Sequence, residues 1–522
     1  MTHEVIRPGA VFALLAALAL APAASATTTD TAALFTQHCA QCHGNDRLGL
    51  MGPALLPENL KRVRRKEAAK VIAEGRAATQ MPPFGQVLNQ AEIDALVDLI
   101  YTPLAKVPDW TVAQIEASRS ILVADADLVT EPVHSADLMN MFIVVELGDH
   151  HASVLDGDRM EPIHRFKTQY AVHGGPKYSP DGRFVYFVSR DGWVNKFDMW
   201  GLQTVATVRA GINARNLAVS GDGRYLMVAN YLPHTLVVLD ATSLEPVKVI
   251  DVVDDSGKSS RVSAVYTADP RNSFVAALKD IREVWEINYQ DYPPRGFGEW
   301  MHDYRTDSGE NRAGKRFPVR RIRVKDYLDD FLFSQDYVTL IGASREGHGQ
   351  VVDLDLGRTT RDLDLPGMPH LASGITWEYE GRMVMATPNL KKAAVSVIDM
   401  KTWETIKEIP TEGPGFFMRS HENTPYAWVD VFFGPNKDKV HVIDKRSLEV
   451  VATLQPAPGK TAAHVEFDKD GRHALLSIWD VDGAVVVYDA ATLREQKRLP
   501  MVKPSGKYNV HNKITRSAGT SH

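Results

Sequence analysis

Tyr178-Ser-Pro-Asp-Gly-Arg-Phe-Val-Tyr-Phe-Val188 is the stretch that decides the fold, because close copies of it recur in the chain. The copies read Val219-Ser-Gly-Asp-Gly-Arg-Tyr-Leu-Met-Val228 and Phe467-Asp-Lys-Asp-Gly-Arg-His-Ala-Leu-Leu476. Each has a tight Asp-Gly-Arg turn followed by a run of apolar, β-branched or aromatic residues, as in an antiparallel strand pair. The first two turns lie roughly 40 residues apart, which is the period of a β-propeller blade. The repeat therefore predicts a propeller of four-stranded blades.

Related strand-turn-strand units fill the chain from about residue 130 onward. After the shared turn, a unit continues with a strand ending in Asp and then an outer strand, as in Val237-Val-Leu-Asp240 and Val442-Ile-Asp444. The eight units begin near Met141, Lys177, Leu217, Arg261, Phe331, Gly374, Phe417 and Ala463. We therefore expect an all-β, eight-bladed propeller over residues 131–522, with a long charged insertion at 288–321.

Ahead of the repeats, the chain contains the motif Cys39-Ala-Gln-Cys42-His43. A thioredoxin-like pair or part of a zinc site would also place two cysteines together, but neither explains the adjacent histidine. In an exported chain, C-x-x-C-H indicates covalent haem attachment, with His43 as a ligand of the iron. Met81 lies on a loop braced by prolines and is the expected second iron ligand. The motif therefore predicts one covalent haem c.

Helical periodicity surrounds these ligands. Apolar spacing predicts one helix over 68–76 and another from Asn89 to Tyr101. Helix, haem loop and C-terminal helix are the minimal plan of a class I cytochrome c. We therefore expect a small all-α cytochrome c domain over residues 27–108, joined to the propeller by a linker at 109–130.

The N-terminus predicts export. Residues 1–26 combine Arg7, a short apolar run and a small-residue cleavage site, as secretory signal peptides do. That run is too short to span a bilayer, and no later one is long enough. Both cysteines belong to the haem motif, so no structural disulfide is expected. We therefore expect a soluble periplasmic protein without a membrane span.

The composition is that of a globular protein. Hydrophobic residues make up 44% of the 522 residues and charged residues 24%. The formal net charge of -6 gives no reason to expect nucleic acid or an anionic membrane as a partner.

Several chemistry-bearing residues occupy equivalent places in the repeats. The first strand of each blade starts at one mouth of the central channel. Residues about six to eight positions before the repeated Asp-Gly-Arg turns should therefore face one another at that mouth. These residues are His173, Arg215 and His464, with Asp329 at the matching place in the fifth unit. Their convergence favours a ligand site over separate structural roles.

A small cytochrome c followed by an eight-bladed propeller resembles the cytochrome cd1 family. The motifs that carry the resemblance are Tyr170-Ala-Val-His173, Ser189-Arg-Asp-Gly-Trp-Val-Asn195, Asn213-Ala-Arg215, Pro369-His370 and Ser505-Gly-Lys-Tyr-Asn-Val510. The resemblance implies that the propeller binds haem d1, a non-covalent tetrapyrrole with several carboxylates. It places His173 on the haem d1 iron and Arg190 and Arg215 on the carboxylates, with Lys279 as a weaker candidate.

The chain departs from the nitrite-reducing members of this family. Those members place two histidines above the iron, whereas this chain keeps one as His370 and has Asp329 in place of the other. An anion there should repel nitrite and cannot supply the same protons. The segment Val145-Glu-Leu-Gly-Asp-His-His151 and the end Gly519-Thr-Ser-His522 look instead like the biosynthetic branch. That branch oxidises a propionate of dihydro-haem d1 to an acrylate.

This resemblance implies an oxidoreductase that removes two electrons and two protons from its tetrapyrrole substrate. His370 or His464 is expected to be the base or the second iron ligand, Tyr508 a hydrogen-bond or proton donor, and Asp329 a group that orients a histidine. Electrons would pass to haem c and then to an external acceptor. Other haem d1 biosynthesis proteins and nitrite reductase are candidate partners. Nitrite reduction and non-enzymatic haem d1 carriage or electron transfer remain the alternative functions.

Overall fold

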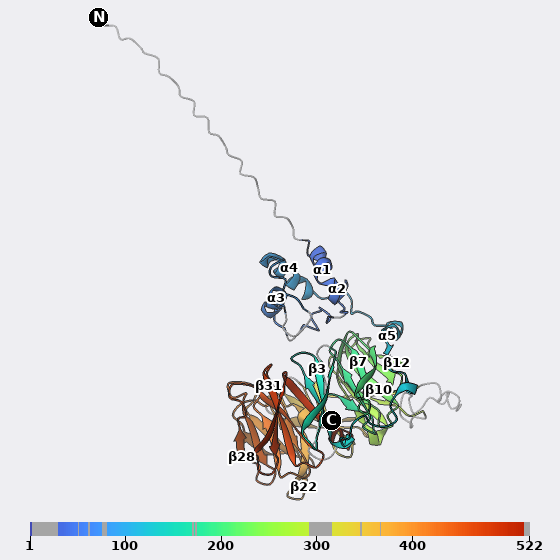
Figure 1. Ribbon diagram of the computed structural model, residues 1–522, viewed down its shortest axis with the longest axis vertical. Coiled ribbons are helices and arrows are strands. Elements are labelled where there is room, and N and C mark those ends of the chain that lie inside the picture. The colour runs from blue at the N-terminus through green and yellow to red at the C-terminus, as the bar shows by residue number, and fades with distance from the viewer. Residues whose placement is uncertain are drawn as a thin grey trace.

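The computed structural model describes residues 1–2, 30–50, 52–60, 63–75, 81–169, 172, 175–291, 316–344, 347–365 and 367–515. A small helical domain lies over one end of a large β domain, and α5 lies where the two meet (Figure 1). The predicted signal peptide beyond its first two residues, His173, most of the insertion and the C-terminal motif at 519–522 lie outside the described residues. None of the helices within the described ranges is long and apolar enough to cross a membrane.

The helical domain has the predicted cytochrome c plan. Its helices are α1 (Thr31–His38), α2 (Ala40–His43), α3 (Arg65–Glu74) and α4 (Gln90–Ile100). A capping box starts α4: the Asn89 side chain accepts the Glu92 amide, and the Glu92 carboxylate accepts the Asn89 amide. The buried faces of α1, α3 and α4 meet in one apolar core that includes Phe35 and Leu96. The helices predicted around Met81 are therefore confirmed as α3 and α4.

The β domain is an eight-bladed propeller, as predicted. From the channel outward, the first four sheets are β33 (Pro504–Asn509), β2 (Met141–Glu146), β3 (His151–Asp156), β4 (Glu161–Lys167); β5 (Lys177–Tyr178), β6 (Phe184–Val188), β7 (Trp193–Asp198), β8 (Gln203–Arg209), with β1 (Ser120–Ile121) added at the edge; β9 (Asn213–Val219), β10 (Tyr225–Leu232), β11 (Thr235–Asp240), β12 (Pro246–Asp251); and β13 (Val262–Ala268), β14 (Ser273–Leu278), β15 (Glu283–Asn288), β16 (Val319–Arg323).

The remaining sheets follow the same order. They are β17 (Asp330–Phe333), β18 (Thr339–Ala343), β19 (His348–Asp353), β20 (Arg358–Asp364); β21 (Ile375–Tyr379), β22 (Arg382–Pro388), β23 (Ala394–Asp399), β24 (Thr405–Pro410); β25 (Met418–Ser420), β26 (Tyr426–Asp430), β27 (Val440–Asp444), β28 (Glu449–Leu454); and β29 (Ala462–Phe467), β30 (His473–Ile478), β31 (Gly483–Asp489), β32 (Glu495–Met501). Short 3₁₀ turns η1 (Asp125–Asp127), η2 (Leu138–Asn140), η3 (Asp269–Arg271) and η4 (Leu371–Ser373) connect elements.

The ring is closed by joining the two ends of the β domain. The last strand, β33, pairs antiparallel with β2, so that Phe142 faces Asn509 and Val144 faces Lys507. The unit predicted near Met141 therefore begins with its second strand, and its channel strand comes from the C-terminal part of the chain. The short helix α6 (Val510–Thr515) follows directly. Closure of this kind leaves no open edge inside the ring.

The repeated turns explain their own sequence. In the first turn, the Asp181 carboxylate accepts the Arg183 amide at 3.1 Å, and Asp222 accepts the Arg224 amide at the same distance in the second. The glycines of these two turns, Gly182 and Gly223, have φ of +76° and +72°, a left-handed conformation that glycine adopts without strain. Apolar residues of neighbouring sheets then pack together between the blades, as Met227 of β10 does with Phe274 and Trp285.

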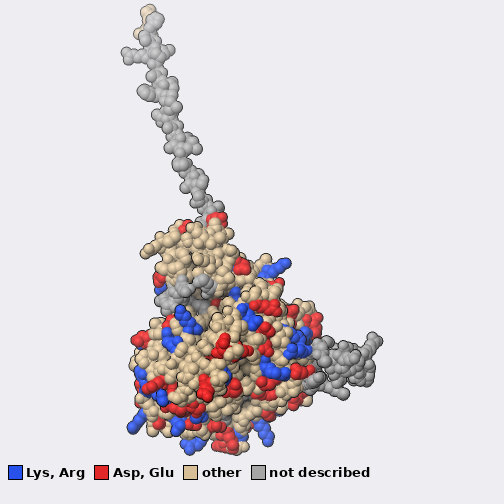
Figure 2. Space-filling view, turned by 45° about the vertical axis from the view of Figure 1, so that its right-hand side comes forward, with Lys and Arg blue, Asp and Glu red and all other residues tan. Residues whose placement is uncertain are grey.

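The segment expected to be a linker is ordered on the propeller. It contains α5 (Val112–Ser118), whose N-terminus has a capping box formed by Thr111 and Gln114. Ile115 of α5 is buried, and β1 pairs with β8 through Ser120 and Thr207. On the side shown in Figure 2, basic and acidic side chains are interspersed over the propeller, whereas the helical domain is largely uncharged.

Candidate functional site

The haem motif occupies the junction of α1 and α2. Cys39 caps α1, Cys42 lies in α2, and the His43 ring at the end of α2 is buried. The His43 Nδ1 atom lies 2.7 Å from the Pro53 carbonyl oxygen, so Nδ1–H donates and Nε2 remains available for iron. A Cβ atom on Gly52 would lie 2.7 Å from the His43 ring, so a glycine is required beside it.

The predicted second ligand, Met81, is half-buried in the same domain. It packs into the apolar cluster that also contains Cys39 and Phe84. An apolar pocket with two thiols, an oriented imidazole and a thioether matches the requirements of a covalently bound haem c. The residues present therefore fit haem c, and Met81 stays a prediction as its second ligand.

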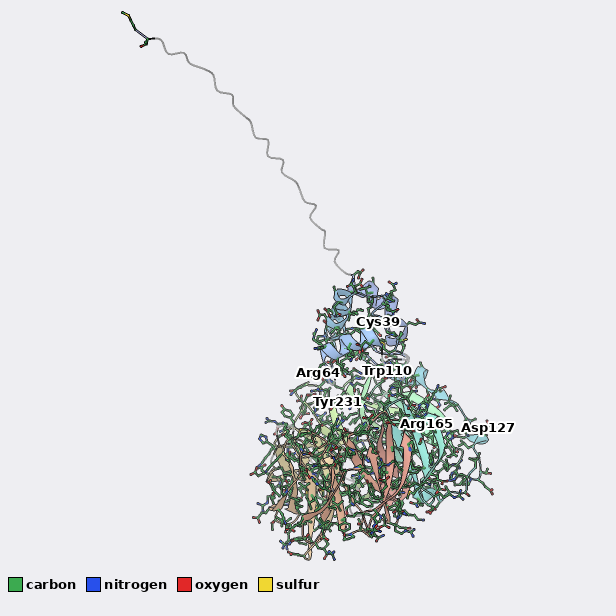
Figure 3. The ribbon with its side chains drawn as sticks, turned by 60° about the vertical axis from the view of Figure 1, so that its left-hand side comes forward. Cys39, Arg64, Trp110, Asp127, Arg165 and Tyr231 are labelled. Carbon is green, nitrogen blue, oxygen red and sulfur yellow. The ribbon has the colours of Figure 1, made fainter. Side chains whose placement is uncertain are left out.

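One mouth of the propeller channel faces the helical domain. Ala54 and Leu56 of the helical domain pack against Ile212, before β9, and Leu232, at the end of β10. The channel strands begin at this end, and the turns between second and third strands lie there too. Trp110 and Tyr231 are labelled at this junction in Figure 3. We call this end the domain-side mouth.

β-Bulges direct several predicted residues at this mouth. Arg215 has no partner in the register of β9 with β10, Ser263 none in β13 with β14, and His464 none in β29 with β30. A bulge inserts an extra residue and turns its side chain out of the regular alternation. His464 accordingly has a left-handed φ of 56°. The Arg215 Nε atom donates to the Ser263 carbonyl at 3.1 Å, so two neighbouring bulges are in contact.

His464 is buried between aromatic rings and cations. Its ring centroid lies 4.8 Å from that of Phe417 and 5.3 Å from that of Tyr508. Burial lowers the pKa of His464 well below its usual value, and the neighbouring cations, led by Lys507 and Arg419, lower it further. The imidazole is therefore neutral at neutral pH, which is the form that ligates a metal.

His370 has a different environment. Its Nδ1–H donates to the Phe416 carbonyl at 2.7 Å, so that Nε2 carries the lone pair of the neutral ring. This Nε2 atom lies 3.8 Å from the Asp330 carboxylate. Burial lowers the pKa of His370, and Asp330 opposes that shift. In this arrangement the His370 Nε2 atom can accept a proton, and Asp330 is placed to stabilise the charged ring.

Asp329, the neighbour of Asp330, forms an ion pair with Lys279. Sequence reasoning expected Asp329 to orient a histidine and Lys279 to hold a carboxylate of the ligand. In the structure these two side chains hold each other, and Asp330 is the carboxylate beside His370. Both predicted roles therefore stay predictions, and Asp330 joins Asp329 as a candidate carboxylate at the mouth.

Arg190 lies in the turn between β6 and β7. Val172, the residue before His173, forms a β-bridge with Ser189 in this turn. The Ala214 amide donates to the Arg190 carbonyl at 3.2 Å. The Arg190 turn, the strand that carries Arg215 and the chain next to His173 are therefore neighbours, as the family resemblance implied.

Below this mouth, the channel contains buried charges that no motif indicated. Arg419 of β25 and Glu466 of β29 are almost fully buried, and Lys513 of α6 approaches the same carboxylate. The Arg419 Nε and Glu466 Oε2 atoms lie 3.9 Å apart, and neither has a hydrogen-bond partner. Buried polar atoms rarely stay unpaired in proteins, so this geometry favours a polar ligand group or water here.

Tyr508 lies in β33 between these charges and the mouth. Burial raises its pKa to about 12, so the hydroxyl keeps its proton at neutral pH. The ring is seated against two glycines, since a Cβ atom on Gly506 would lie 2.2 Å from the hydroxyl and one on Gly175 would lie 2.7 Å from the ring. The protonated hydroxyl of Tyr508 can donate a hydrogen bond, and its role as a donor to the ligand stays a prediction.

Aromatic rings form one wall of the mouth. Phe416, Phe417, Phe432 and Trp479 make a continuous series of ring contacts, with centroid separations from 4.5 to 6.5 Å. An aromatic wall in contact with His370 and His464, at a mouth that also contains arginines, suits a planar ring system with anionic side chains and a metal. The residues present therefore fit a tetrapyrrole.

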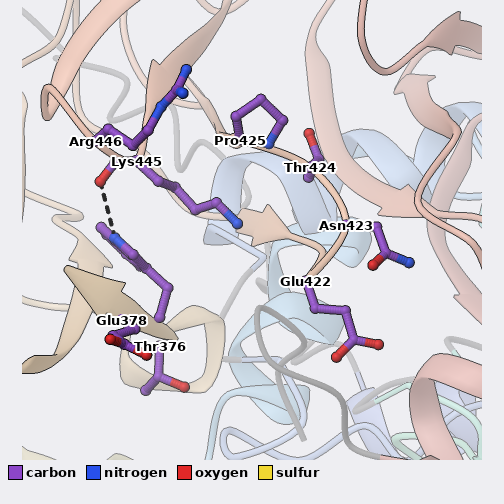
Figure 4. A pocket seen from close by; sticks show the side chains of 9 residues that line it. Thr376, Glu378, Glu422, Asn423, Thr424, Pro425, Lys445 and Arg446 are labelled. Atoms are coloured by element: carbon purple, nitrogen blue, oxygen red, sulfur yellow. Dashed lines mark hydrogen bonds between the residues drawn. The ribbon is translucent and has the colours of Figure 1, made fainter. Parts of the chain in front are cut away.

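A pocket of about 420 Å³ opens at the other end of the propeller (Figure 4). Its lining comes from β21 and from the turns after β25 and β27, and the Trp377 indole donates to the Lys445 carbonyl at 3.1 Å. It contains none of the predicted residues. The domain-side mouth is therefore the candidate site.

Comparisons with known proteins agree with this geometry. Residues 136–513 match the model of the cytochrome D1 heme domain. The chain belongs to that family. Residues 26–100 match the model of cytochrome C oxidase, cbb3-type, subunit III, which supports a haem c in the helical domain of this family member.

Relatives within the cytochrome D1 heme family differ in how similar they are. The dihydro-heme d1 dehydrogenase of Pseudomonas aeruginosa is 53% identical, over 97% of this chain and 98% of its own length. The nitrite reductase of Stutzerimonas stutzeri is 25% identical, over 96% and 95%. A solved structure of dihydro-heme d1 dehydrogenase NirN in complex with DHE has 53% identity and a TM-score of 0.86, covering 92% of this chain and 99% of that one.

Proposed function

We propose that this chain is a dihydro-haem d1 dehydrogenase that converts a propionate side chain of its tetrapyrrole substrate to an acrylate. The observation that carries the proposal is the pairing, at the domain-side mouth, of an oriented proton acceptor, His370, with buried cations. Full-length similarity to a dehydrogenase of that name supports the same reaction. The helical domain supplies haem c, which accepts electrons one at a time.

The reaction turns –CH₂–CH₂–COO⁻ into –CH=CH–COO⁻, so two C–H bonds break and two protons and two electrons leave. His370 removes the proton next to the carboxylate, because its Nε2 lone pair is available and Asp330 stabilises the imidazolium that forms. Arg215 and Arg419 lie close enough to His370 to lower its pKa. The same cations hold the substrate carboxylate and stabilise the charge that develops on it.

The other residues of the mouth bind and orient the substrate. His464, kept neutral by burial and neighbouring cations, is suited to ligate the substrate iron on one face, with His173 as the predicted ligand on the other. Arg190 pairs a peripheral carboxylate. Tyr508 donates a hydrogen bond, since its raised pKa keeps the hydroxyl protonated. The aromatic wall of Phe416 and its neighbours excludes water from the ring.

Each turnover needs an acceptor outside this chain. Bound haem c would take up one electron at a time, so an external acceptor would have to remove the first electron before the second could follow. His370 likewise releases the first proton towards solvent past Asp330 before it accepts the second. The product haem d1 is a cofactor for a nitrite reductase, so that enzyme or other haem d1 biosynthesis proteins are the partners that we propose.

Residues 1–26 are proposed to direct export and to be removed, because haem attachment to C-x-x-C-H belongs to exported proteins. Cell fractionation with N-terminal sequencing of the mature chain tests this. A periplasmic protein that starts near residue 27 is the expected result, and a cytoplasmic protein that retains residue 1 contradicts it.

The activity is tested by loading the full-length holoprotein with dihydro-haem d1, adding an oxidant, and following absorbance and cofactor mass. Loss of two hydrogens from the tetrapyrrole, together with transient reduction of haem c, is the expected result. Unchanged tetrapyrrole with nitrite turnover would instead assign the chain to nitrite reduction. Tight binding with neither reaction would make it a carrier.

A further inference from the structure

Arg209, at the end of β8, connects three separate parts of the chain. It is 4% exposed, and its guanidinium makes three hydrogen bonds to backbone carbonyls. The Nε atom donates to Asp191 at 2.9 Å, Nη1 to Gly49 at 3.1 Å and Nη2 to Leu48 at 2.6 Å. Asp191 belongs to the propeller, whereas Leu48 and Gly49 belong to the helical domain. A buried arginine with this bonding pattern fixes the two domains to each other.

The linker closes over the same side chain. The Arg209 guanidinium carbon lies 4.7 Å from the ring centroid of Trp110, within the range of a cation–π interaction. The Trp110 indole donates to the Arg209 carbonyl at 2.8 Å, and the Arg209 amide donates to the Ser118 hydroxyl at 2.8 Å. The linker therefore shields Arg209 from solvent, and its charge acts in a medium of low polarity.

On the helical side, Arg209 holds the loop that seats the iron ligand. The Gly49 amide donates to the His43 carbonyl at 2.9 Å, and the Gly52 amide donates to the Cys42 carbonyl at 2.8 Å. The Pro53 carbonyl at the end of this loop accepts His43 Nδ1–H. A shift at Leu48 or Gly49 therefore reaches the orientation of the proximal histidine directly.

On the propeller side, Arg209 holds the turn that carries Arg190. Asp191 is 5% exposed, and burial raises the pKa of its carboxyl to about 7 against the opposing effect of Arg209 and Arg190. The Ala210 amide donates to the Gly192 carbonyl at 2.8 Å, and a Cβ atom on Gly192 would lie 2.0 Å from Gly211. The turn therefore has little room to move without moving Arg209.

We propose that Arg209 is a positioning residue that couples occupancy of the domain-side mouth to the reduction potential of haem c. Its buried positive charge beside the haem loop favours the reduced form of haem c. A substrate carboxylate bound at Arg190 brings negative charge to the same turn and lowers the potential. Linkage makes the effect reciprocal, with the same factor in both directions. Reduction of haem c therefore weakens tetrapyrrole binding, and reoxidation of haem c by the external acceptor restores it. The effect of bound substrate on the potential rests on the proposed function, whereas the effect of the Arg209 charge does not.

The test measures the midpoint potential of haem c in the full-length holoprotein by spectroelectrochemistry, without and with dihydro-haem d1. Arg209→Gln removes the charge, whereas Arg209→Lys keeps the charge but loses the guanidinium that bonds to three backbone carbonyls. Arg119→Gln is the matched control, because Arg119 ties the same linker to the propeller through the Ser243 carbonyl and the Glu245 carboxylate.

Without tetrapyrrole, Arg209→Gln should lower the midpoint potential, whereas Arg209→Lys and Arg119→Gln should leave it near that of the parent. Added dihydro-haem d1 should lower the potential in the parent and in Arg119→Gln, and by much less in both Arg209 variants. An unchanged potential in Arg209→Gln overturns the proposal, as does full retention of the tetrapyrrole-induced shift. If Arg209→Gln does not fold, the loss of coupling in Arg209→Lys still decides. A missing dehydrogenase activity would sink the proposed function alone, because the tetrapyrrole-free potentials would be unaffected.

Discussion

The helical domain and the propeller collect their functional residues in different ways. The haem c site takes Cys39, Cys42 and His43 from one turn of chain, and its loop is ordered by local hydrogen bonds. The domain-side mouth takes Arg190, His370 and His464 from three different blades, and a bulge turns His464 out of the regular strand alternation. A substitution in the contiguous haem c site should therefore abolish the function of the whole site. A substitution in the mouth, whose residues come from different blades, can remove one function and leave another. The following predictions use that difference.

The largest effect is expected from Cys42→Ala. Loss of one thioether removes covalent attachment through that position and disturbs the seat of His43, so haem-dependent electron uptake should fall to background. Tetrapyrrole binding should persist, because the mouth takes no residue from α2. A haem stain on denaturing gels and a tetrapyrrole titration measure the two properties. Simultaneous loss of tetrapyrrole binding in a folded variant would contradict the separation of the two sites.

The next effect divides the mouth itself. His370→Ala should lower the dehydrogenation rate by about 10²–10⁴-fold with little change in tetrapyrrole affinity, because it removes a general base. His464→Ala should instead weaken binding and change the absorbance spectrum of the bound tetrapyrrole. His348→Ala serves as the control, since that side chain is 73% exposed. Equal rate and affinity profiles for the two mouth variants would refute the assigned roles.

A smaller effect is expected from the channel charges. Glu466→Gln leaves Arg419 and Lys513 without their buried counter-charge and should destabilise the propeller by about 3–5 kcal/mol. Thermal unfolding measures this change, and added tetrapyrrole should restore part of the stability by supplying carboxylates. Glu495→Gln, which breaks an ion pair with Arg498 at the rim, should change stability by no more than about 1 kcal/mol. An equal loss in both variants would remove the case for a charged channel floor.

The smallest effect concerns pH. A hydrogen bond that the His473 ring donates to the Asp468 carboxylate raises the pKa of His473 above its unfolded value of 6.5. Its stabilisation is therefore complete below that pH and is lost as pH rises through the folded pKa. His473→Gln should therefore cost at most about 1 kcal/mol in mildly acidic buffer and less in alkaline buffer. His464 has the opposite sign, because its lowered pKa makes protonation unfavourable in the fold. Stability curves that are parallel across pH for His473→Gln and the parent would exclude this linkage.

The sequence made the fold and the haem c motif predictable, because both are encoded locally. Each Asp-Gly-Arg turn predicts the blade in which it lies, and the five residues of C-x-x-C-H predict the haem c site. Arg419, Lys513 and Arg209 belong to no such pattern, since their meaning depends on sheets that meet only in the closed ring. Positions in the repeats supplied the mouth residues His173, Arg215, Asp329 and His464. Family resemblance added Arg190, His370 and the reaction, which is also the one named for the 53% identical relative.

Asp329 illustrates the limit at the level of one residue. Both its position in the repeat and the family resemblance placed Asp329 at the mouth. Neither of these features shows which of the adjacent residues Asp329 and Asp330 points towards His370. Lys279 neutralises Asp329 in the structure, so the expected repulsion of nitrite is weaker than the bare sequence implied. The missing second histidine remains the stronger reason that the chain differs from nitrite-reducing relatives. Asp330 became the relevant carboxylate only once His370 could be placed against it.

The pairing of β33 with β2 has a consequence for biogenesis. With the proposed signal peptide, export would deliver the chain from its N-terminus. The haem c region would then reach the periplasm first, and the strand that carries Lys507 and Tyr508 would reach it last. Until β33 takes its place, the ring is open and the channel wall beside His464 is missing. The order of delivery therefore sets the order of assembly, because haem c can be attached before a tetrapyrrole can bind. An incompletely delivered chain should therefore not retain a scarce, reactive cofactor in its unfinished mouth.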